Sequence, residues 1–80
     1  MISPAQCRAA RGLLSWTQAD LAKAASVGVA TVRQFEGESG TPRPATLTVL
    51  RQALEEAGLE FIPENGGGAG IRFLERKDRG

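Results

Sequence analysis

The stretch TQADLAKAASVGVATVRQFEGE, residues 17–38, constrains the fold more than any other part of this chain. It contains two short helical patterns separated by a break of about four residues. Each pattern is only about nine residues long, and helices this short do not persist alone in water. The two helices must therefore pack against each other and against further helices, which leaves polar side chains of the second helix for a partner.

The first helix of this pair has a clear N-terminal signal. Thr17 is a favourable N-cap residue, and Asp20, three residues on, completes a capping box. Trp16 and Leu21 occupy the N′ and N4 positions of a hydrophobic staple. The sequence SVG then breaks the pattern, and the second helix is predicted to run from residue 28 or 29 to Glu36.

Two further helices are predicted around this pair. The sequence SPAQ supplies an N-cap serine, a proline at N1 and the glutamine of a capping box, so a helix follows to about residue 12 or 13. A last helix is predicted from near Pro44 to Gly58, a glycine suited to ending a helix. The expected core-facing residues recur at helical spacing: Cys7, Ala10, Leu14, Leu21, Ala22, Ala25, Val27, Val32, Phe35, Leu47, Leu50, Leu54 and Ala57.

The pattern changes its period after residue 58. LEFI and IRFL are short β-type runs joined by PENGGGAG, which contains an Asn-Gly turn signal. Because a two-stranded hairpin is marginal alone in water, this one is expected to pack on its own helices, on a second subunit, or on both. The small size of the chain favours a homodimer, for which the hairpin supplies Phe61, Ile62, Ile71 and Phe73.

These patterns predict a mainly α protein, a four- to five-helix bundle with a C-terminal β-hairpin. Residues 1–58 form the helical domain, and residues 59–80 form the hairpin extension and a charged tail. No apolar run approaches the roughly 20 residues of a membrane span. The single cysteine is compatible with a reducing compartment, so a cytoplasmic protein without a membrane partner is expected.

The residue inventory argues against an enzyme, a metal site or a bound cofactor. The chain has no histidine and one cysteine, Cys7, which is expected to be a small core residue. The run GGGAG lacks the Lys-Ser/Thr of a phosphate-binding loop. Ten Lys and Arg against nine Asp and Glu give a net charge of +1, so any binding to nucleic acid must depend on where the charges lie.

Two short helices joined by a tight turn have the spacing of a helix-turn-helix. Their inner faces pack against a third helix, and the outer face of the second helix is then free to enter the major groove of DNA, which is about 12 Å wide. Helix N-termini at such an interface can also hold phosphates through exposed N–H groups.

Much of the chain resembles helix-turn-helix transcriptional regulators of the Cro and phage-repressor type, the xenobiotic-response-element class. The matching stretches are RGLLSWTQADLAKAASVGVATVRQFEGE and the following PRPATLTVLRQALEEAGLEF. The resemblance covers roughly residues 5–60 and implies the phage-repressor-like DNA-binding fold. The tail GLEFIPENGGGAGIRFL looks like an extension found in a bacterial subset of these regulators. The matching positions, in order, are Arg11, Gly12, Leu14, Thr17, Gln18, Leu21, Ala22, Val27, Thr31, Val32, Phe35, Glu36 and Gly37.

The resemblance implies a role for individual residues. Val29, Ala30, Arg33 and Gln34 match positions that face base edges. Thr17, Gln18, Gly28 and Arg43 fall where the family holds the phosphate backbone, and Arg11 and Glu36 match an ion pair that ties the first helix to the end of the third. Read singly, Gln18, Arg33 and Gln34 could instead be solvated helix residues.

The chain also departs from the family pattern. Ser26 stands where the turn usually has glycine, and Gly28 stands where the next helix usually has a Ser or Thr cap. Val29 and Ala30 are apolar, so they are either partly buried or in contact with thymine methyl groups, and direct readout falls mostly to Arg33 and Gln34.

The sequence therefore predicts a DNA-binding transcriptional regulator, a repressor that binds a palindromic operator in double-stranded DNA as a homodimer. The main alternative is a protein-interaction module, such as an antitoxin or anti-activator, that keeps the helix-turn-helix frame but binds a protein partner. A coactivator that bridges proteins is a further alternative.

Overall fold

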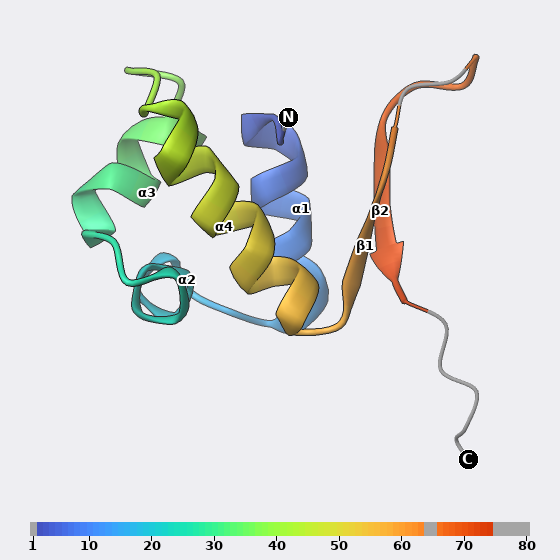
Figure 1. The fold of residues 1–80 in the computed structure, drawn as a ribbon, viewed down its shortest axis with the longest axis horizontal. Helices are drawn as coiled ribbons and strands as arrows, with labels where there is room; N and C mark the ends of the chain where they lie inside the picture. The colour runs from blue at the N-terminus through green and yellow to red at the C-terminus, as the bar shows by residue number, and fades with distance from the viewer. Residues whose placement is uncertain (1, 64–65, 75–80) are drawn as a thin grey trace.

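The computed structural model describes residues 2–63 and 66–74, and the charged tail of residues 75–80 lies outside this part. The described chain is mainly helical, with a two-stranded antiparallel hairpin near its C-terminal end (Figure 1), as the sequence patterns predict. The elements, in order, are α1 (Pro4–Leu14), α2 (Gln18–Ala25), α3 (Val29–Glu36), α4 (Pro44–Glu56), β1 (Leu59–Ile62) and β2 (Gly70–Phe73).

Both predicted capping boxes are present. The Ser3 hydroxyl accepts from the backbone N–H of Gln6 at 3.1 Å, and the Gln6 side chain accepts from the N–H of Ser3 at 3.0 Å. At the start of α2, the Thr17 hydroxyl accepts from the N–H of Asp20 at 3.0 Å, and the Asp20 carboxylate accepts from the N–H of Thr17 at 2.9 Å. These contacts satisfy donors that a helix N-terminus leaves without a partner in its own helix.

The core lies between α4 and the other three helices. Its large, fully buried side chains are those expected at helical spacing, with Leu59 added from β1: Leu21, Leu50, Leu54, Leu59, Val32 and Cys7. Burial of each such leucine or valine contributes about 1.5–3 kcal/mol, which is what holds the short α2 and α3 in place. No helix in residues 2–63 and 66–74 meets the length and apolarity required of a membrane span.

The turn between α2 and α3 matches the predicted break at SVG. Ser26 ends α2 in the left-handed conformation, with a φ of 59°, which explains why glycine would suit this position. Gly28 is the N-cap of α3 and provides no side-chain hydrogen bond. Packing therefore holds the α2–α3 pair together, because no side-chain hydrogen bond caps the start of α3.

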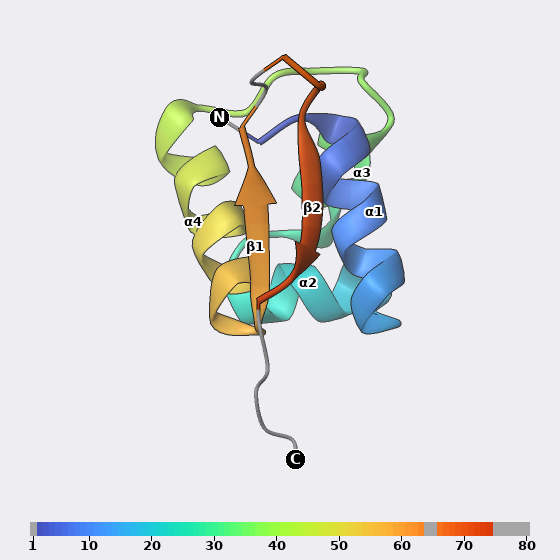
Figure 2. The same cartoon turned by 90° about the vertical axis from the view of Figure 1, so that its right-hand side faces the viewer.

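The hairpin packs on the helices of its own chain. Leu59 pairs with Phe73 and Phe61 pairs with Ile71, and both β1 members of these pairs are buried. Figure 2 shows the two strands lying across α1 and α4. The Gln6 side chain of α1 donates a hydrogen bond to the carbonyl of Gly70 at 3.0 Å, which fixes β2 against α1.

Candidate nucleic-acid interface

Helix α3 lies at one end of the molecule, and the hairpin lies at the other (Figure 1). Its inward side is buried through Val32, Phe35 and Glu36. All four residues that were predicted to face base edges are solvent-exposed: Val29, Ala30, Arg33 and Gln34. An α-helix with its side chains is about 10–12 Å in diameter, which matches the width of a DNA major groove, about 12 Å.

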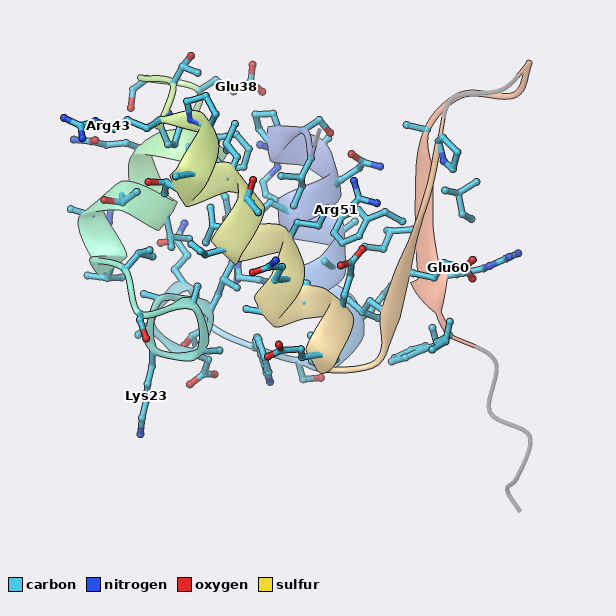
Figure 3. All side chains as sticks on the ribbon, in the orientation of Figure 1. Lys23, Glu38, Arg43, Arg51 and Glu60 are labelled. Atoms are coloured by element: carbon cyan, nitrogen blue, oxygen red, sulfur yellow. The ribbon has the colours of Figure 1, made fainter. Side chains whose placement is uncertain are left out.

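The positive charges of the described residues divide into two groups. Four arginines lie within 4 Å of a carboxylate oxygen: Arg8, Arg11, Arg51 and Arg72. Within residues 2–63 and 66–74, Lys23, Arg33 and Arg43 have no such ion pair. These three come from α2, α3 and the loop before α4. Figure 3 shows Arg43 extending to solvent beside α3, whereas Lys23 extends from the side of α2 that points away from α3. Two of the three cations without an ion pair, Arg33 and Arg43, therefore lie on α3 or beside it.

A polar hollow of about 430 Å³ lies between α3 and the loop that leads to α4. It brings Gln34, a predicted base-reading residue, next to Arg43, a predicted phosphate-binding residue. Three threonine hydroxyls complete its lining, with Gly40 and Pro42: Thr31, Thr41 and Thr46. Hydroxyl, amide and guanidinium donors suit the phosphate and sugar oxygens of a nucleic-acid backbone.

The remaining predicted phosphate-binding residues lie at the N-termini of helices. Thr17 is the N-cap of α2, Gly28 is the N-cap of α3, and Arg43 is the N-cap of α4. Gln18, the first residue of α2, donates one hydrogen bond from its side-chain amide to Glu36 at 3.1 Å. An amide NH₂ group has two N–H donors, and Glu36 accepts from one of them.

A buried carboxylate holds α3 against α1 and α2. Glu36 is 4% exposed, and Arg11 donates to both of its oxygens at 2.7 Å, forming a bidentate ion pair. The Cys7 thiol donates to Oε2 and the Gln18 amide to Oε1, each at 3.1 Å. Arg8 also donates to the backbone carbonyl of Glu36. The carboxylate thus accepts four hydrogen bonds and has no oxygen left for a ligand.

The pKa values within this cluster follow from burial and from these contacts. Burial alone would raise the pKa of Glu36, but hydrogen bonds from Arg11, Cys7 and Gln18 outweigh it and lower that pKa below its usual range. Burial, followed by the hydrogen bond to Glu36, raises the pKa of the Cys7 thiol, which therefore stays protonated at neutral pH. Glu36 is the ionised centre of the cluster, and Cys7 is a neutral donor to it.

Sequence reasoning placed Arg11 with Glu36 but missed Cys7 and Gln18 as further donors. One signal was available for the cysteine, because residues four apart on a helix lie on the same face, as Cys7 and Arg11 do on α1. Nothing in the sequence pattern indicates that the Gln18 amide reaches Glu36, since the two lie on different helices.

The residues predicted for dimerisation differ in their accessibility. Phe61 is buried against the helices, and Arg51 lies over its ring with a guanidinium-to-centroid distance of 5.2 Å. Ile62 and Ile71 are half-buried, whereas Phe73 is 46% exposed. All four lie on the hairpin, at the other end of the molecule from α3.

Comparison with protein-family models and with curated protein sequences found no match to this chain. The site is therefore interpreted from its own geometry. In the part of the chain that the structure describes, no cluster of three or more His, Cys, Asp or Glu could hold a metal ion.

Proposed function

We propose that this chain is a helix-turn-helix transcriptional regulator that binds double-stranded DNA, with α3 in the major groove. The observation that supports this proposal best is the distribution of charge. Among the described cations, those without an ion pair are Lys23, Arg33 and Arg43, and two of them, Arg33 and Arg43, lie on or beside α3. The electrostatic attraction of a protein surface for a polyanion is strongest where no neighbouring carboxylate neutralises the positive charge.

Within this proposal the residues of α3 divide into two chemical kinds. Arg33 can bind guanine O6 and N7 through two hydrogen bonds, and Gln34 can bind adenine N6 and N7 in the same manner. Val29 and Ala30, both exposed, have only methyl groups to offer and suit the methyl group of thymine. Few direct base contacts are then available, so part of the site preference would come from the shape of the DNA.

Arg43 has a different role in the proposal, because it precedes α4 and lies in the polar hollow beside α3. A guanidinium in that place can hold a phosphate while α3 lies in the groove. Such a contact positions the protein and reads no sequence. Gln18, Thr17 and Gly28 would add backbone contacts from the N-termini of α2 and α3.

A protein partner at α3 is the second candidate, and one observation favours it. Val29 is 37% exposed beside Ala30, so the first turn of α3 presents apolar side chains within the proposed interface. The net charge of +1 is also low for a DNA-binding protein. This chain would then be an antitoxin or anti-activator, and its α3 surface would bind an apolar side chain of the protein partner.

Selection of bound sequences from randomised duplex DNA separates the two candidates. Enrichment of a defined sequence supports DNA reading, and its bases test the pairing of Arg33 with guanine and Gln34 with adenine. A matched pair of variants provides the control: Arg33→Gln removes a cation beside the groove, and Arg72→Gln removes an exposed, ion-paired cation from the hairpin. Only the first should weaken binding to the selected duplex. No enrichment at low salt would refute DNA reading and favour the protein partner.

A further inference from the structure

The hairpin has an outward face that the helices do not cover. Because Leu59 and Phe61 are buried, the alternate residues Glu60 and Ile62 point the other way. Figure 3 shows Glu60 extending away from the helices. The cross-strand partners of these two residues are Arg72 and Gly70, and Leu74 extends the same row, since its N–H donates to the carbonyl of Gly58 at 2.7 Å. We call this surface the outward hairpin face: Glu60, Ile62, Gly70, Arg72 and Leu74.

This face is complementary to a copy of itself. At its centre, Arg72 Nε lies 3.0 Å from Glu60 Oε1, and both side chains are well exposed. An aliphatic side chain lies at each end of the row, Ile62 at one and Leu74 at the other. In a two-fold pair the same surface meets itself, so the acid of one copy can face the base of the other.

We propose that the outward hairpin face binds a second copy of this chain, and that the pair carries its two α3 surfaces on opposite sides and bridges two DNA segments. The bridging rests on the function proposed above, whereas the pairing of chains does not. This pair differs from the dimer expected from the sequence, in which both copies contact one palindromic site.

The bridging geometry follows from the arrangement of the elements. In Figure 1, α3 and the hairpin lie at opposite ends of the longest axis, with α1 and α4 between them. The perpendicular view agrees, because the hairpin faces the viewer and α3 lies behind α1 and α4 (Figure 2). Two copies that meet at the outward hairpin face therefore point their α3 surfaces away from each other. One straight duplex cannot contact both surfaces.

Pairing along a strand edge would give a different dimer, with both α3 surfaces on one side. Figure 2 shows α4 projecting beyond β1 and α1 projecting beyond β2. Strands pair when they approach to about 4.8 Å, and each of these helices lies beside the edge that a second copy would have to approach. The outward face, in contrast, has nothing in front of it in the described part of the chain (Figure 3).

The size of the face makes the contact weak. Each strand has four residues, so the face is only about 13 Å long at roughly 3.3 Å per residue. Two strands side by side are about 10 Å wide, so the face covers roughly 130 Å², far below the ~800 Å² per partner of a stable interface. Pairing is therefore expected at high protein concentration, or where many chains lie side by side on DNA and weak contacts act in parallel.

Two charge reversals test the pairing directly. Glu60→Arg makes the centre of the face wholly positive, and Arg72→Glu makes it wholly negative. Sedimentation velocity up to about 1 mM protein should show association of the wild type that weakens about tenfold or more in each variant alone. An equimolar mixture of the two variants should recover it, because opposite charges then face each other. Both residues are exposed, so neither reversal should unfold the chain, which a thermal melt checks.

The DNA arm uses two duplexes of the same selected sequence, one biotinylated on beads and one fluorescent in solution. Wild-type protein should retain the fluorescent duplex on the beads. Each reversal should abolish retention, although its binding to a single duplex, measured by fluorescence anisotropy, stays close to that of the wild type. The mixture of the two variants should restore retention.

The outcomes separate the two proposals. Binding to single duplexes without retention of the second duplex would overturn the bridging and leave the proposed function standing. No binding to any duplex would refute the proposed function and the bridging together, while sedimentation still decides the pairing. Equal association of the wild type and both variants, or none in the wild type, would overturn the pairing.

Discussion

Replacement of Glu36 by glutamine should destabilise this protein far more than the same replacement at an exposed glutamate. Both carboxylate oxygens of Glu36 accept two hydrogen bonds, Oε1 from Arg11 and Gln18 and Oε2 from Arg11 and Cys7. A glutamine in this place presents its NH₂ group to two donors, whichever way the amide is turned. The substitution therefore removes a charge and sets donors against donors in the core.

The expected cost can be bounded from known cases. Removal of one partner of a buried ion pair costs about 3–5 kcal/mol. Glutamine keeps one acceptor oxygen and Arg11 is 20% exposed, so the lower end, about 3 kcal/mol, applies. For a domain of this size each kcal/mol lowers Tm by about 4–8 °C, which gives a fall of roughly 12–24 °C. The free energy of unfolding of a domain of this size is only about 4–12 kcal/mol, so a loss of about 3 kcal/mol is a large fraction of it.

Thermal unfolding followed by circular dichroism measures this effect, with Glu55→Gln as the matched control. Glu55 pairs with Arg51 across one helical turn at 2.9 Å, but both side chains are about two-fifths exposed. Such a pair contributes less than about 0.5 kcal/mol. A Tm for Glu36→Gln within a few degrees of that of Glu55→Gln would refute the reasoning that the Glu36 cluster stabilises the fold.

The pH dependence provides an independent check. Because the pKa of Glu36 is lowered by folding, its charge stabilises the protein above the unfolded-state pKa of about 4.3. That stabilisation is lost as the pH falls through the lower folded-state pKa. The Tm difference between the wild type and Glu36→Gln should therefore be constant from about pH 7 to pH 5 and shrink below about pH 4. A difference that does not shrink in acid would contradict the lowered pKa.

The remaining predictions concern the proposed DNA interface and the turn beside it. Arg43→Ala should weaken binding to all duplexes alike and lower the salt slope of log K by about 1, as measured by anisotropy from low to high salt; a loss confined to one sequence would contradict a phosphate contact. Arg33→Ala should cost about 1–3 kcal/mol on the selected sequence and relax the preference at one base pair, as competition with single-base variants would reveal; a uniform loss on all sequences would argue against base reading. Ser26→Gly should raise Tm by roughly 2–8 °C, because glycine relieves about 0.5–1 kcal/mol of left-handed strain at φ 59°; an unchanged or lower Tm would contradict this.

The helices could be predicted from sequence because their signals are local. The Ser3 and Thr17 capping boxes, the helical start at Pro44 and the apolar spacing all act within a few residues of one another. The C-terminal ends of these helices were predicted less accurately than their starts. Helix α1 continues to Leu14, past the expected end at residue 12 or 13, because packing of Leu14 against the core outweighs the cost of about 1 kcal/mol for Gly12 within the helix. Helix α4 ends at Glu56, and Gly58 follows with a φ of 106°.

The non-local parts of the molecule could not be derived in the same way. The pattern of LEFI and IRFL predicted two strands but left open whether they pack on their own helices, on a second subunit, or on both. Burial of Leu59 and Phe61 shows that the hairpin packs on its own helices, and contact with a second subunit stays a prediction. The donors of Glu36 lie 18, 25 and 29 residues away in the chain, and no periodicity connects such positions. Only the resemblance to a family, and no pattern in the residues, indicated that Arg11 meets Glu36.

The same cluster limits how the helix-turn-helix segment could be reused. The segment of residues 17–38 contains Glu36 and Gln18, but Arg11 and Cys7 come from α1. In a host protein that received this segment alone, the buried carboxylate of Glu36 would keep one of its four hydrogen bonds. The free-energy cost of that buried charge would detach α3 from the fold. Transplantation therefore requires a guanidinium from the host where Arg11 lies, or an apolar residue in place of Glu36. The set α1–α3 keeps the four hydrogen bonds to Glu36, and α4 must accompany it because Leu50 and Leu54 of α4 form the core beneath these helices.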